Sequence, residues 1–578
     1  MSGLKVGYPV LIDGAKSSHR SRRAWVAGAA ASLLAVGLLF APLSQGIPKA
    51  YDLRDHLGAT FQVLKSIQSG DLYPRWLSDF HGGFGEPTLL FYPPGLYLVS
   101  APLSALFGGD VLAGLYAALA LFAFAGCLGA FAFVRRRFGL GAGMLAAVVY
   151  GLVPFRVFEV YGSGLYSSFA AWSLLPWMLL CLTDCVEEND GGPTRPGVVA
   201  WPALVAAMTL TNLPAVVLLL YLTTFWLAVR AVAAKRLTEA LRILTLAAWG
   251  AAMAAVHVIP ALVEMPSVQI LGEELYRGNF LFQGKGFGMG EGIRLVFDRM
   301  GLLPAIALAV SLVLLGGARP SGDADLDRRR RTFTLLAGLF GGTSLFFATA
   351  AARWAWELLP VLQKVNLPWR LLEPLSASAA VASAAAAAVL ARPGAAAPLR
   401  AGGAILLAGI GLFGLVFDGS LSAANGKITA AECRAAIPQF ARKEAYFLPK
   451  GARHASEMAE TPPLACDQPC GVAVVEHAPS RRRIRVAAQT PVHLAVRTYY
   501  FPGWTARIVD GGSTERLPIG AEPGTGRIVV EVPPGDHVIE LRFGSTPPRL
   551  AGGAISVLSL GAWAIWIGAR RRRSAAAG

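Results

Sequence analysis

The chain has 578 residues, of which 54% are hydrophobic and only 15% are charged, whereas about 25% of the residues of a soluble protein are charged. Uncharged apolar runs near the ~20 residues needed to cross a bilayer recur along most of the chain, which excludes a soluble globular protein. The net charge of +16 arises largely from Arg and Lys clusters between apolar runs or near the chain ends. Such clusters are typical of cytoplasmic loops and argue against nucleic-acid binding.

The N-terminal tail, residues 1–23, is basic and precedes an uncharged run over 24–43. This run is longer than the core of a signal peptide and lacks a small-x-small cleavage site. We therefore predict a retained first helix with a cytoplasmic N-terminus, and signal cleavage is the alternative.

The first outer loop, predicted over 44–110, opens with the run Asp52-Leu53-Arg54-Asp55-His56. If this run is helical, Asp52, Asp55 and His56 share one face and form an acid–base or cation-binding cluster. The alternative is a solvated polar loop. Further along, the apolar segment 91–107 opens on Pro93-Pro94. It cannot span if the next run returns to the cytoplasm, so we expect it to lie along the interface or re-enter and to shape a cavity.

The remaining chain contains further apolar runs, most of them separated by basic loops. The predicted spans are about 12 in number and lie near 24–43, 111–134, 139–157, 168–186, 198–212, 214–230, 243–262, 300–316, 332–350, 371–391, 401–417 and 549–569. This order places every dense Arg cluster on one side of the membrane and both termini in the cytoplasm. The transmembrane domain is thus expected over 24–417, with a final helix and basic tail over 549–578.

The only large hydrophilic region is 418–548. Alternating residues and Gly/Pro turns predict strands at Val492–Tyr500, Thr505–Asp510, Arg527–Val532 and His537–Phe543. We expect an extracytoplasmic β-sandwich with a binding, positioning or lid role, since it contains no nucleophile motif.

The six cysteines fall into two groups of three. In the hydrophilic region, Cys433, Cys466 and Cys470 predict one disulfide whose partners remain open. The other three lie in apolar segments, where they are expected to be small buried side chains: Cys127, Cys181 and Cys185.

Outer loops above many helices suit an amphiphilic substrate, and the available residues fit glycosyl transfer from a lipid phosphate. Asp52 or Asp55 would take the proton of the acceptor hydroxyl, with His56 holding the base or sharing a cation. Phosphate charge would be stabilised by cations or by a metal such as Mg²⁺ or Mn²⁺, for which Asp52, Asp55 and His56 are candidate ligands. The candidate substrate-binding residues are Arg54, Trp76, Tyr92, Arg156, Arg277, Lys285 and Arg370. Solvated or snorkelling charges and interfacial aromatic side chains are the alternative roles for these residues.

Several motifs resemble those of a known family. The first loop, with Asp52-Leu53-Arg54-Asp55-His56 and Phe91-Tyr92-Pro93-Pro94, is similar to the bacterial membrane proteins labelled 6-pyruvoyl-tetrahydropterin synthase-related. Leu367-Pro368-Trp369-Arg370 resembles their late outer-loop motif, and Tyr499-Tyr500-Phe501-Pro502-Gly503-Trp504 resembles the C-terminal domain of YfhO-like proteins.

This resemblance implies a GT-C architecture in the bacterial inner membrane, with a polyprenyl-phosphate-linked sugar as donor. The acceptor would be a lipid, a glycan or a protein on the outer face. A first-loop aspartate is the base in such enzymes, which corresponds to Asp52 or Asp55, although this chain has Asp-Leu-Arg-Asp-His instead of an adjacent acidic pair. The competing hypotheses are a transporter or flippase for lipid-linked glycans and an assembly factor that binds through its outer domain.

Overall fold

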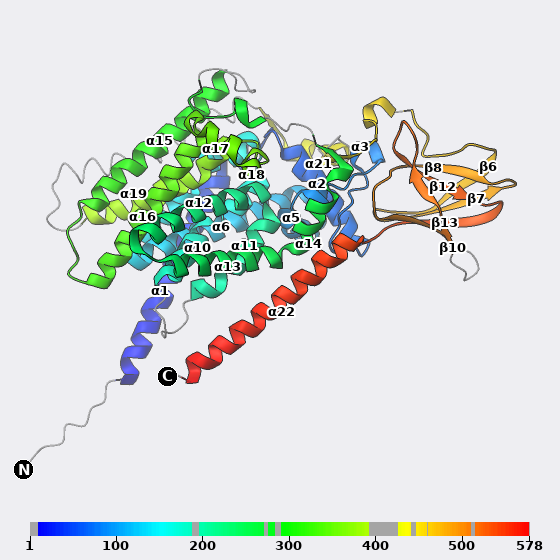
Figure 1. The fold of residues 1–578 in the computed structure, drawn as a ribbon. Helices are drawn as coiled ribbons and strands as arrows, with labels where there is room; N and C mark the ends of the chain where they lie inside the picture. Colours follow the sequence, from blue (N-terminus) through cyan, green and yellow to red (C-terminus); the bar gives the residue numbers. More distant parts are fainter. Residues whose placement is uncertain are drawn as a thin grey trace, which may run out of the picture.

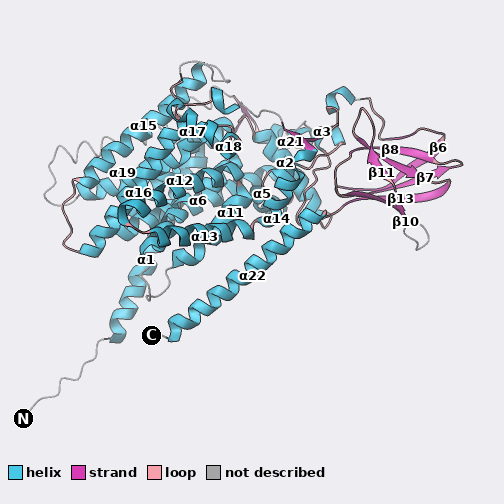
Figure 2. Ribbon diagram, in the orientation of Figure 1, coloured by secondary structure: helices cyan, strands magenta, loops and turns pink. Residues whose placement is uncertain are grey.

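The computed structural model describes residues 10–187, 196–270, 275–283, 291–391, 426–440, 447–458, 460–509 and 515–576. A helical body carries a β domain at one end, and the last helix runs from that domain back along the body (Figure 1). The start of the first described helix and the end of the last helix lie on the same side of the molecule, away from the β domain. Figure 2 shows most of the strands gathered in this one domain.

The helices of the body differ widely in length. They are α1 (Val10–Phe40), α2 (Leu53–Gln68), α3 (Phe80–Gly83), α4 (Thr88–Phe91), α5 (Gly95–Leu106), α6 (Val111–Phe138), α7 (Leu140–Gly151), α8 (Pro154–Phe158), α9 (Tyr166–Trp172), α10 (Leu175–Glu187), α11 (Pro196–Thr211), α12 (Leu213–Ala234), α13 (Leu237–Met253), α14 (Ala255–Glu264), α15 (Glu291–Gly316), α16 (Ala324–Ala348), α17 (Arg353–Leu358), α18 (Pro360–Gln363), α19 (Leu372–Leu390), α21 (Ala430–Phe440) and α22 (Pro547–Ala576).

Eight helical stretches within the described residues are long and apolar enough to cross a membrane. They are Ser21–Gln45, Val111–Phe138, Leu140–Ser163, Tyr166–Glu187, Leu213–Ala234, Arg294–Gly316, Pro368–Leu390 and Pro547–Arg570. Each coincides with a predicted span, so the polytopic, mainly helical fold class is confirmed.

The other four predicted spans do not coincide with single long apolar helices of the described residues, which therefore contain fewer than twelve candidate spans. The span near 243–262 is a bent pair, α13 and α14, with an angle of 76° at the break. The span near 198–212 falls on α11, which has only 16 residues, and the span near 332–350 falls on α16, whose first half is rich in charge. The span near 401–417 lies outside the described residues.

The segment after the double proline forms α5, a helix of 12 residues. At 1.5 Å per residue it is about 18 Å long, well short of the ~30 Å hydrocarbon core. It packs closely on α6, where a Cβ added to Gly114 would lie 2.1 Å from the Ser104 hydroxyl. The length of α5 agrees with the prediction that this segment does not span.

The basic helix ends gather at one end of the bundle. The Arg136 guanidinium at the end of α6 pairs with Asp184 on α10 at 2.5 Å, and Arg137 pairs with Glu187 at 3.2 Å. Arg330 on α16 donates to the Arg137 carbonyl at 3.1 Å. These contacts join the Arg clusters of α6 and α16 to each other and to the acidic end of α10, as expected if the three helix ends share one membrane face.

The β domain consists of two antiparallel sheets. Its strands are β5 (Leu464–Cys466), β6 (Cys470–Ala478), β7 (Arg481–Ala488), β8 (Val492–Tyr499), β9 (Trp504–Ile508), β10 (Glu515–Leu517), β11 (Ile519–Ala521), β12 (Arg527–Val532) and β13 (Gly535–Phe543). One sheet has the order β10-β9-β13-β7-β6 and the other β11-β12-β8-β5. Inward residues of both sheets, such as Ile484, Leu494 and Ile539, form one apolar core. The four predicted strands are all present, with ends that shift by one or two residues.

The chain between the body and these sheets ties the two parts together. β3 (Lys427–Ile428) pairs with β1 (Ile47–Pro48), and β4 (Phe447–Pro449) pairs with β2 (Val268–Ile270). The helix α21 packs on α2. The two β sheets therefore begin only at Leu464, later than the domain start at 418 that composition suggested.

The structure also shows which cysteines are paired and which are free. Cys466 and Cys470 form a disulfide, whereas Cys433 is free and buried. The three cysteines of the apolar segments are free and buried, as expected: Cys127, Cys181 and Cys185.

Candidate functional site

The acidic run of the first loop stands at the start of α2, as the helical prediction required. The Asp52 N–H donates to the Ser163 carbonyl at 2.9 Å, and Tyr51 N–H donates to Gly162 at 3.3 Å. Both carbonyls belong to a π-helical turn over Glu159–Ser163. The next residue, Gly164, has φ +72°, and a Cβ there would lie 3.0 Å from the Asp52 nitrogen. The start of α2 is thus fixed by a close backbone contact that only glycine permits.

The His56 ring is buried, with 3% of its surface exposed. Its Nδ1 lies 3.0 Å from the Tyr97 hydroxyl, and the ring also hydrogen-bonds the Gly164 backbone. Burial lowers the pKa of His56 from 6.5 to about 3, against a smaller rise from the Gly164 contact. The imidazole is therefore neutral, accepts from Tyr97 and donates to the Gly164 carbonyl. With both nitrogens occupied, it anchors α2 rather than acting as a base or metal ligand.

Tyr92 marks the point where the first loop meets later parts of the chain. Its hydroxyl contacts the Ser167 hydroxyl. Burial raises the pKa of Tyr92 to about 12, against a smaller lowering by that hydrogen bond. Among the charged groups, Asp52 and Asp55 raise this pKa and Arg370 lowers it. Two acidic residues and one cation therefore lie within electrostatic range of this phenol.

Arg370 belongs to the late motif, on a 3₁₀ turn over Pro368–Leu371 that leads into α19. Trp369 anchors this turn in the helical core, with its ring 4.7 Å from that of Phe297. Arg370 is half-buried and lies within electrostatic range of Asp52 and Glu159. Its place at a helix N-terminus adds positive potential. The tertiary structure thus places this cation within electrostatic range of Asp52 in the first loop.

Arg156 has a different environment. It is fully buried and pairs with Glu373 at 2.6 Å, while its guanidinium donates to Tyr150 at 3.0 Å and Ser173 at 2.8 Å. The Phe169 ring centre lies 4.1 Å from its guanidinium carbon. Because its charge is neutralised inside the bundle, Arg156 is not a phosphate-binding residue of this site.

Two further candidates lie away from the Tyr92 cluster. Trp76 is 2% exposed and packs against β-domain rings, with Trp504 at 5.4 Å and Phe543 at 5.2 Å. It is covered by protein and cannot stack on a sugar. Arg54 is exposed, and its guanidinium carbon lies 5.5 Å from the Phe440 ring centre.

The last two candidates belong to the later outer loop. Arg277 donates to the Tyr276 hydroxyl at 3.3 Å, in a cluster where Tyr276 stacks on Trp356. Lys285 lies outside the described residues.

The proposed metal site does not fit this arrangement. No group of three or more His, Cys, Asp or Glu residues suited to a metal ion occurs within the described parts of the chain. His56 is occupied by Tyr97 and Gly164. The chemistry below therefore uses no step through a metal.

Two residues of the cluster, Tyr166 and Asn212, were not singled out by sequence. The Tyr166 ring centre lies 5.2 Å from that of His56, and that of Tyr97, which the sequence indicated as an interfacial or sugar-stacking aromatic residue, lies 5.9 Å away. Asn212 donates to Ser167 at 3.1 Å and its side chain caps α12 by accepting from the Ala215 N–H at 2.9 Å. Of the two missed residues, only Asn212 had a sequence signal, because Asn followed by Leu-Pro is typical of a helix N-terminus.

Fold and site together define a polytopic membrane protein with a docked β domain. Its polar cluster lies between the first loop and the N-terminus of α19. The profile of the family described as "6-pyruvoyl-tetrahydropterin synthase related domain; membrane protein" matches residues 89–425. The chain belongs to this family. No curated protein sequence matches it.

Two solved structures show distant likeness. The first is the oligosaccharyltransferase of Archaeoglobus fulgidus tethered to an acceptor peptide, with 14% identity and a TM-score of 0.42 over 70% of this chain. The chain covers 56% of that protein's length. The second is ArnT from Cupriavidus metallidurans bound to undecaprenyl phosphate, with 15% identity and a TM-score of 0.40 over 72% of this chain and 73% of that one. Similarity at this level does not establish a shared activity.

Proposed function

We propose that this protein is a membrane glycosyltransferase that moves a sugar from a polyprenyl-phosphate-linked donor to an acceptor on the extracytoplasmic face. The observation that supports this proposal is that Asp52, Asp55 and Arg370 all lie within electrostatic range of Tyr92. A base, here at the start of α2, and a cation, here before α19, are the two groups that transfer from a lipid phosphate requires.

The reaction assigns one task to each charged group. The carboxylate of Asp52 or Asp55 accepts the proton of the acceptor hydroxyl as its oxygen attacks the anomeric carbon. The bond between that carbon and the phosphate oxygen breaks, and the phosphate leaves with the electron pair. Arg370 stabilises this charge through its guanidinium fork. Both aspartates are half-buried, so the substrate reaches them from the outer side.

The test uses the full-length protein in nanodiscs and a panel of radiolabelled polyprenyl-phosphate sugars with a cell-envelope extract as acceptor. We expect Asp52→Asn or Asp55→Asn to reduce release of polyprenyl phosphate by about 100-fold or more, since a general base contributes that much. Arg370→Gln should slow transfer and weaken donor binding.

Asp536→Asn is the matched control, because Asp536 is an exposed β-domain residue paired with Arg485 at 2.5 Å. Full transfer by both single variants and by the double variant of Asp52 and Asp55 would refute the proposal.

A transporter of lipid-linked glycans is the second candidate, favoured by ionisable groups within the candidate spans. Arg156 and Glu159 lie in the span Leu140–Ser163, and Glu373 lies in Pro368–Leu390. Charged groups at such depth often mark a translocation path. Movement of the labelled donor across a sealed vesicle membrane without release of polyprenyl phosphate would select this candidate instead.

A further inference from the structure

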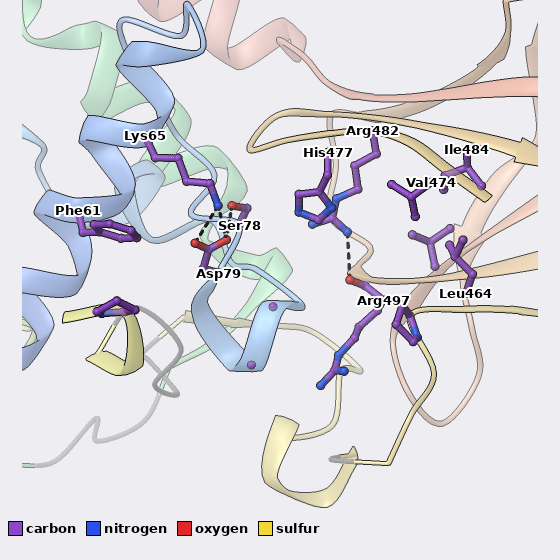
Figure 3. Close-up of a pocket in the computed structure, with 15 residues that line it drawn as sticks. Phe61, Lys65, Ser78, Asp79, Leu464, Val474, His477, Arg482, Ile484 and Arg497 are labelled. Atoms are coloured by element: carbon purple, nitrogen blue, oxygen red, sulfur yellow. Dashed lines mark hydrogen bonds and ion pairs between the residues drawn. The ribbon is translucent and has the colours of Figure 1, made fainter. Parts of the chain in front are cut away.

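A cavity lies at the junction between the first outer loop and the β domain, with a volume of about 490 Å³. Figure 3 shows Lys65 and Asp79 on one wall and His477, Arg482 and Arg497 on the other. None of its lining residues lies within a candidate membrane span. The cavity therefore opens on the aqueous side, and its volume falls within the range of about 300–1,000 Å³ typical of small-molecule sites.

Arg482 is the unusual residue of this cavity. On β7, Arg482 lies on the same inward face as the core residues Ile484 and Val486. Only 4% of its surface is exposed. Its Nη1 donates to the Arg497 carbonyl at 3.0 Å and to the Thr498 hydroxyl. Its Nε and Nη2 have no hydrogen-bond partner among the described residues. Arg482 also lines the cavity, and a buried guanidinium with unpartnered donors beside a cavity is suited to an anion.

The opposite wall offers Arg482 one carboxylate, Asp79, which attracts the guanidinium but is shared with Lys65. Asp79 accepts from Lys65 at 3.0 Å and from Ser78 at 2.9 Å, so its carboxylate is already engaged. The charged lining residues are Lys65, Arg482 and Arg497 against Asp79 alone, a surplus of two positive charges when His477 is neutral. Burial lowers the pKa of His477, and the nearby Arg482 and Lys65 lower it further, which keeps this ring neutral near pH 7.

Most of the remaining lining is apolar and includes the Phe61 ring together with Val474, Ile484 and Val496. Sugar rings pack their C–H faces on such surfaces. A lipid would instead need an apolar path from the cavity into the bilayer, and no lining residue belongs to a span. We propose that this cavity binds an acidic saccharide, with the sugar ring on the apolar wall and its phosphate or carboxylate on Arg482 and Arg497. This site is separate from the Tyr92 cluster, and its existence does not depend on glycosyl transfer.

The proposal is tested by calorimetry on the full-length protein in nanodiscs. The probes are glucose 6-phosphate, glucuronate, neutral glucose and dihexanoyl phosphatidic acid. We expect at least one acidic sugar to bind, more weakly as salt is raised, and glucose to show no binding. Arg482→Gln should weaken that binding by about tenfold or more, because it removes charge-assisted hydrogen bonds.

Two further variants keep the test valid if Arg482→Gln fails to fold. Arg497→Gln should weaken binding of the acidic sugar, whereas Asp79→Asn should strengthen it by removing the only carboxylate among the lining residues. Arg483→Gln is the matched control, because Arg483 follows Arg482 on β7 but pairs with Glu540 at 2.9 Å. It should bind the acidic sugar as the wild type does.

Four results would overturn the proposal. The first is no binding of either acidic sugar, and the second is equal binding of glucose. The third is binding that Arg482→Gln and Arg497→Gln, both folded, leave unchanged. Tighter binding of the lipid phosphate than of both acidic sugars would also reject it and assign the cavity to a lipid headgroup.

Discussion

Burial determines which charge state each polar side chain of the first loop keeps. The His56 ring is enclosed by three tyrosines, which removes the water that a charged imidazole needs. Glu86 is completely buried beside His81 at 2.8 Å, and burial raises its pKa, against the lowering by His81. By contrast, Asp52 and Asp55 at the start of α2 are only half-buried. Of these side chains, only the two aspartates therefore keep part of their surface exposed.

The pKa of His56 predicts a specific dependence of stability on pH. The unfolded chain protonates this ring near 6.5, whereas the folded protein resists protonation down to about 3. The unfolded state thus binds more protons in this window, so the contribution of His56 is complete above pH 6.5 and is lost as pH falls. The stability advantage of the wild type over His56→Asn should shrink by up to about 1.4 kcal/mol per pH unit. Thermal unfolding in detergent between pH 7.5 and 5 measures this difference.

His493 provides a control of opposite sign. It is exposed beside Asp467, whose hydrogen bond raises the pKa of His493, so its contribution is lost as pH rises instead. An advantage over His56→Asn that stays constant across the pH range would show that the ring is not held neutral by burial.

At the level of elements, the π-helical turn and the start of α2 form one unit. Two backbone hydrogen bonds join them, from Tyr51 to Gly162 and from Asp52 to Ser163. The turn follows α8 and precedes α9, which carries Ser167. A shift of this turn would move the aspartates relative to Tyr92.

Gly164→Ala tests this coupling. The new Cβ would lie 3.0 Å from the nitrogens of both Asp52 and Leu53, at a φ of +72°. We expect a loss of about 1–3 kcal/mol in the free energy of unfolding from strain and displaced backbone, together with reduced transfer activity. Gly108→Ala is the matched control, since Gly108 has φ +66° but nothing within 4 Å of an added Cβ. Equal effects of the two substitutions on stability and activity would contradict the proposed contact.

At the level of the whole molecule, the β domain is attached to the body by a polar anchor and an aromatic cluster. Arg549, fully enclosed at the start of α22, pairs with Glu264 on α14 at 2.8 Å and donates to the carbonyls of Gly544 and Pro502 at 2.7 and 2.8 Å. The Phe543 ring centre lies 4.6 Å from its guanidinium carbon. This one side chain joins β domain, last helix and bent helix pair.

Arg549→Gln should therefore loosen the domain and reduce stability by about 3–5 kcal/mol, because it leaves a buried carboxylate without a cation. Thermal unfolding and the rate of limited proteolysis near residues 447–464 measure the two effects. The combined change Arg549→Met with Glu264→Gln should recover part of the loss. Arg572→Gln, on an exposed residue at the other end of α22, serves as control, and an equal effect of both single variants would contradict the anchoring role.

Sequence alone determined the features that depend on local composition. Eight of the predicted spans, the four strands of the β domain and the helix after Asp52 follow from hydrophobic runs and alternation, which chain neighbours specify without distant partners. The pairing of Cys466 with Cys470 was open in sequence because three cysteines of the hydrophilic region allow more than one partner. The bend between α13 and α14 had no local signal strong enough to predict it.

Only the tertiary structure decided which candidate residues share a site. Arg156 and Arg370 look alike in sequence as outer cations, but one meets Glu373 inside the bundle and the other lies near Asp52. The cationic cavity around Arg482 is formed by segments of the first loop and the β domain. Sequence periodicity reports which face of an element is apolar, whereas charge compensation and desolvation depend on which distant residues pack against that face. That is the physical reason why the fold class was predictable and the membership of the site was not.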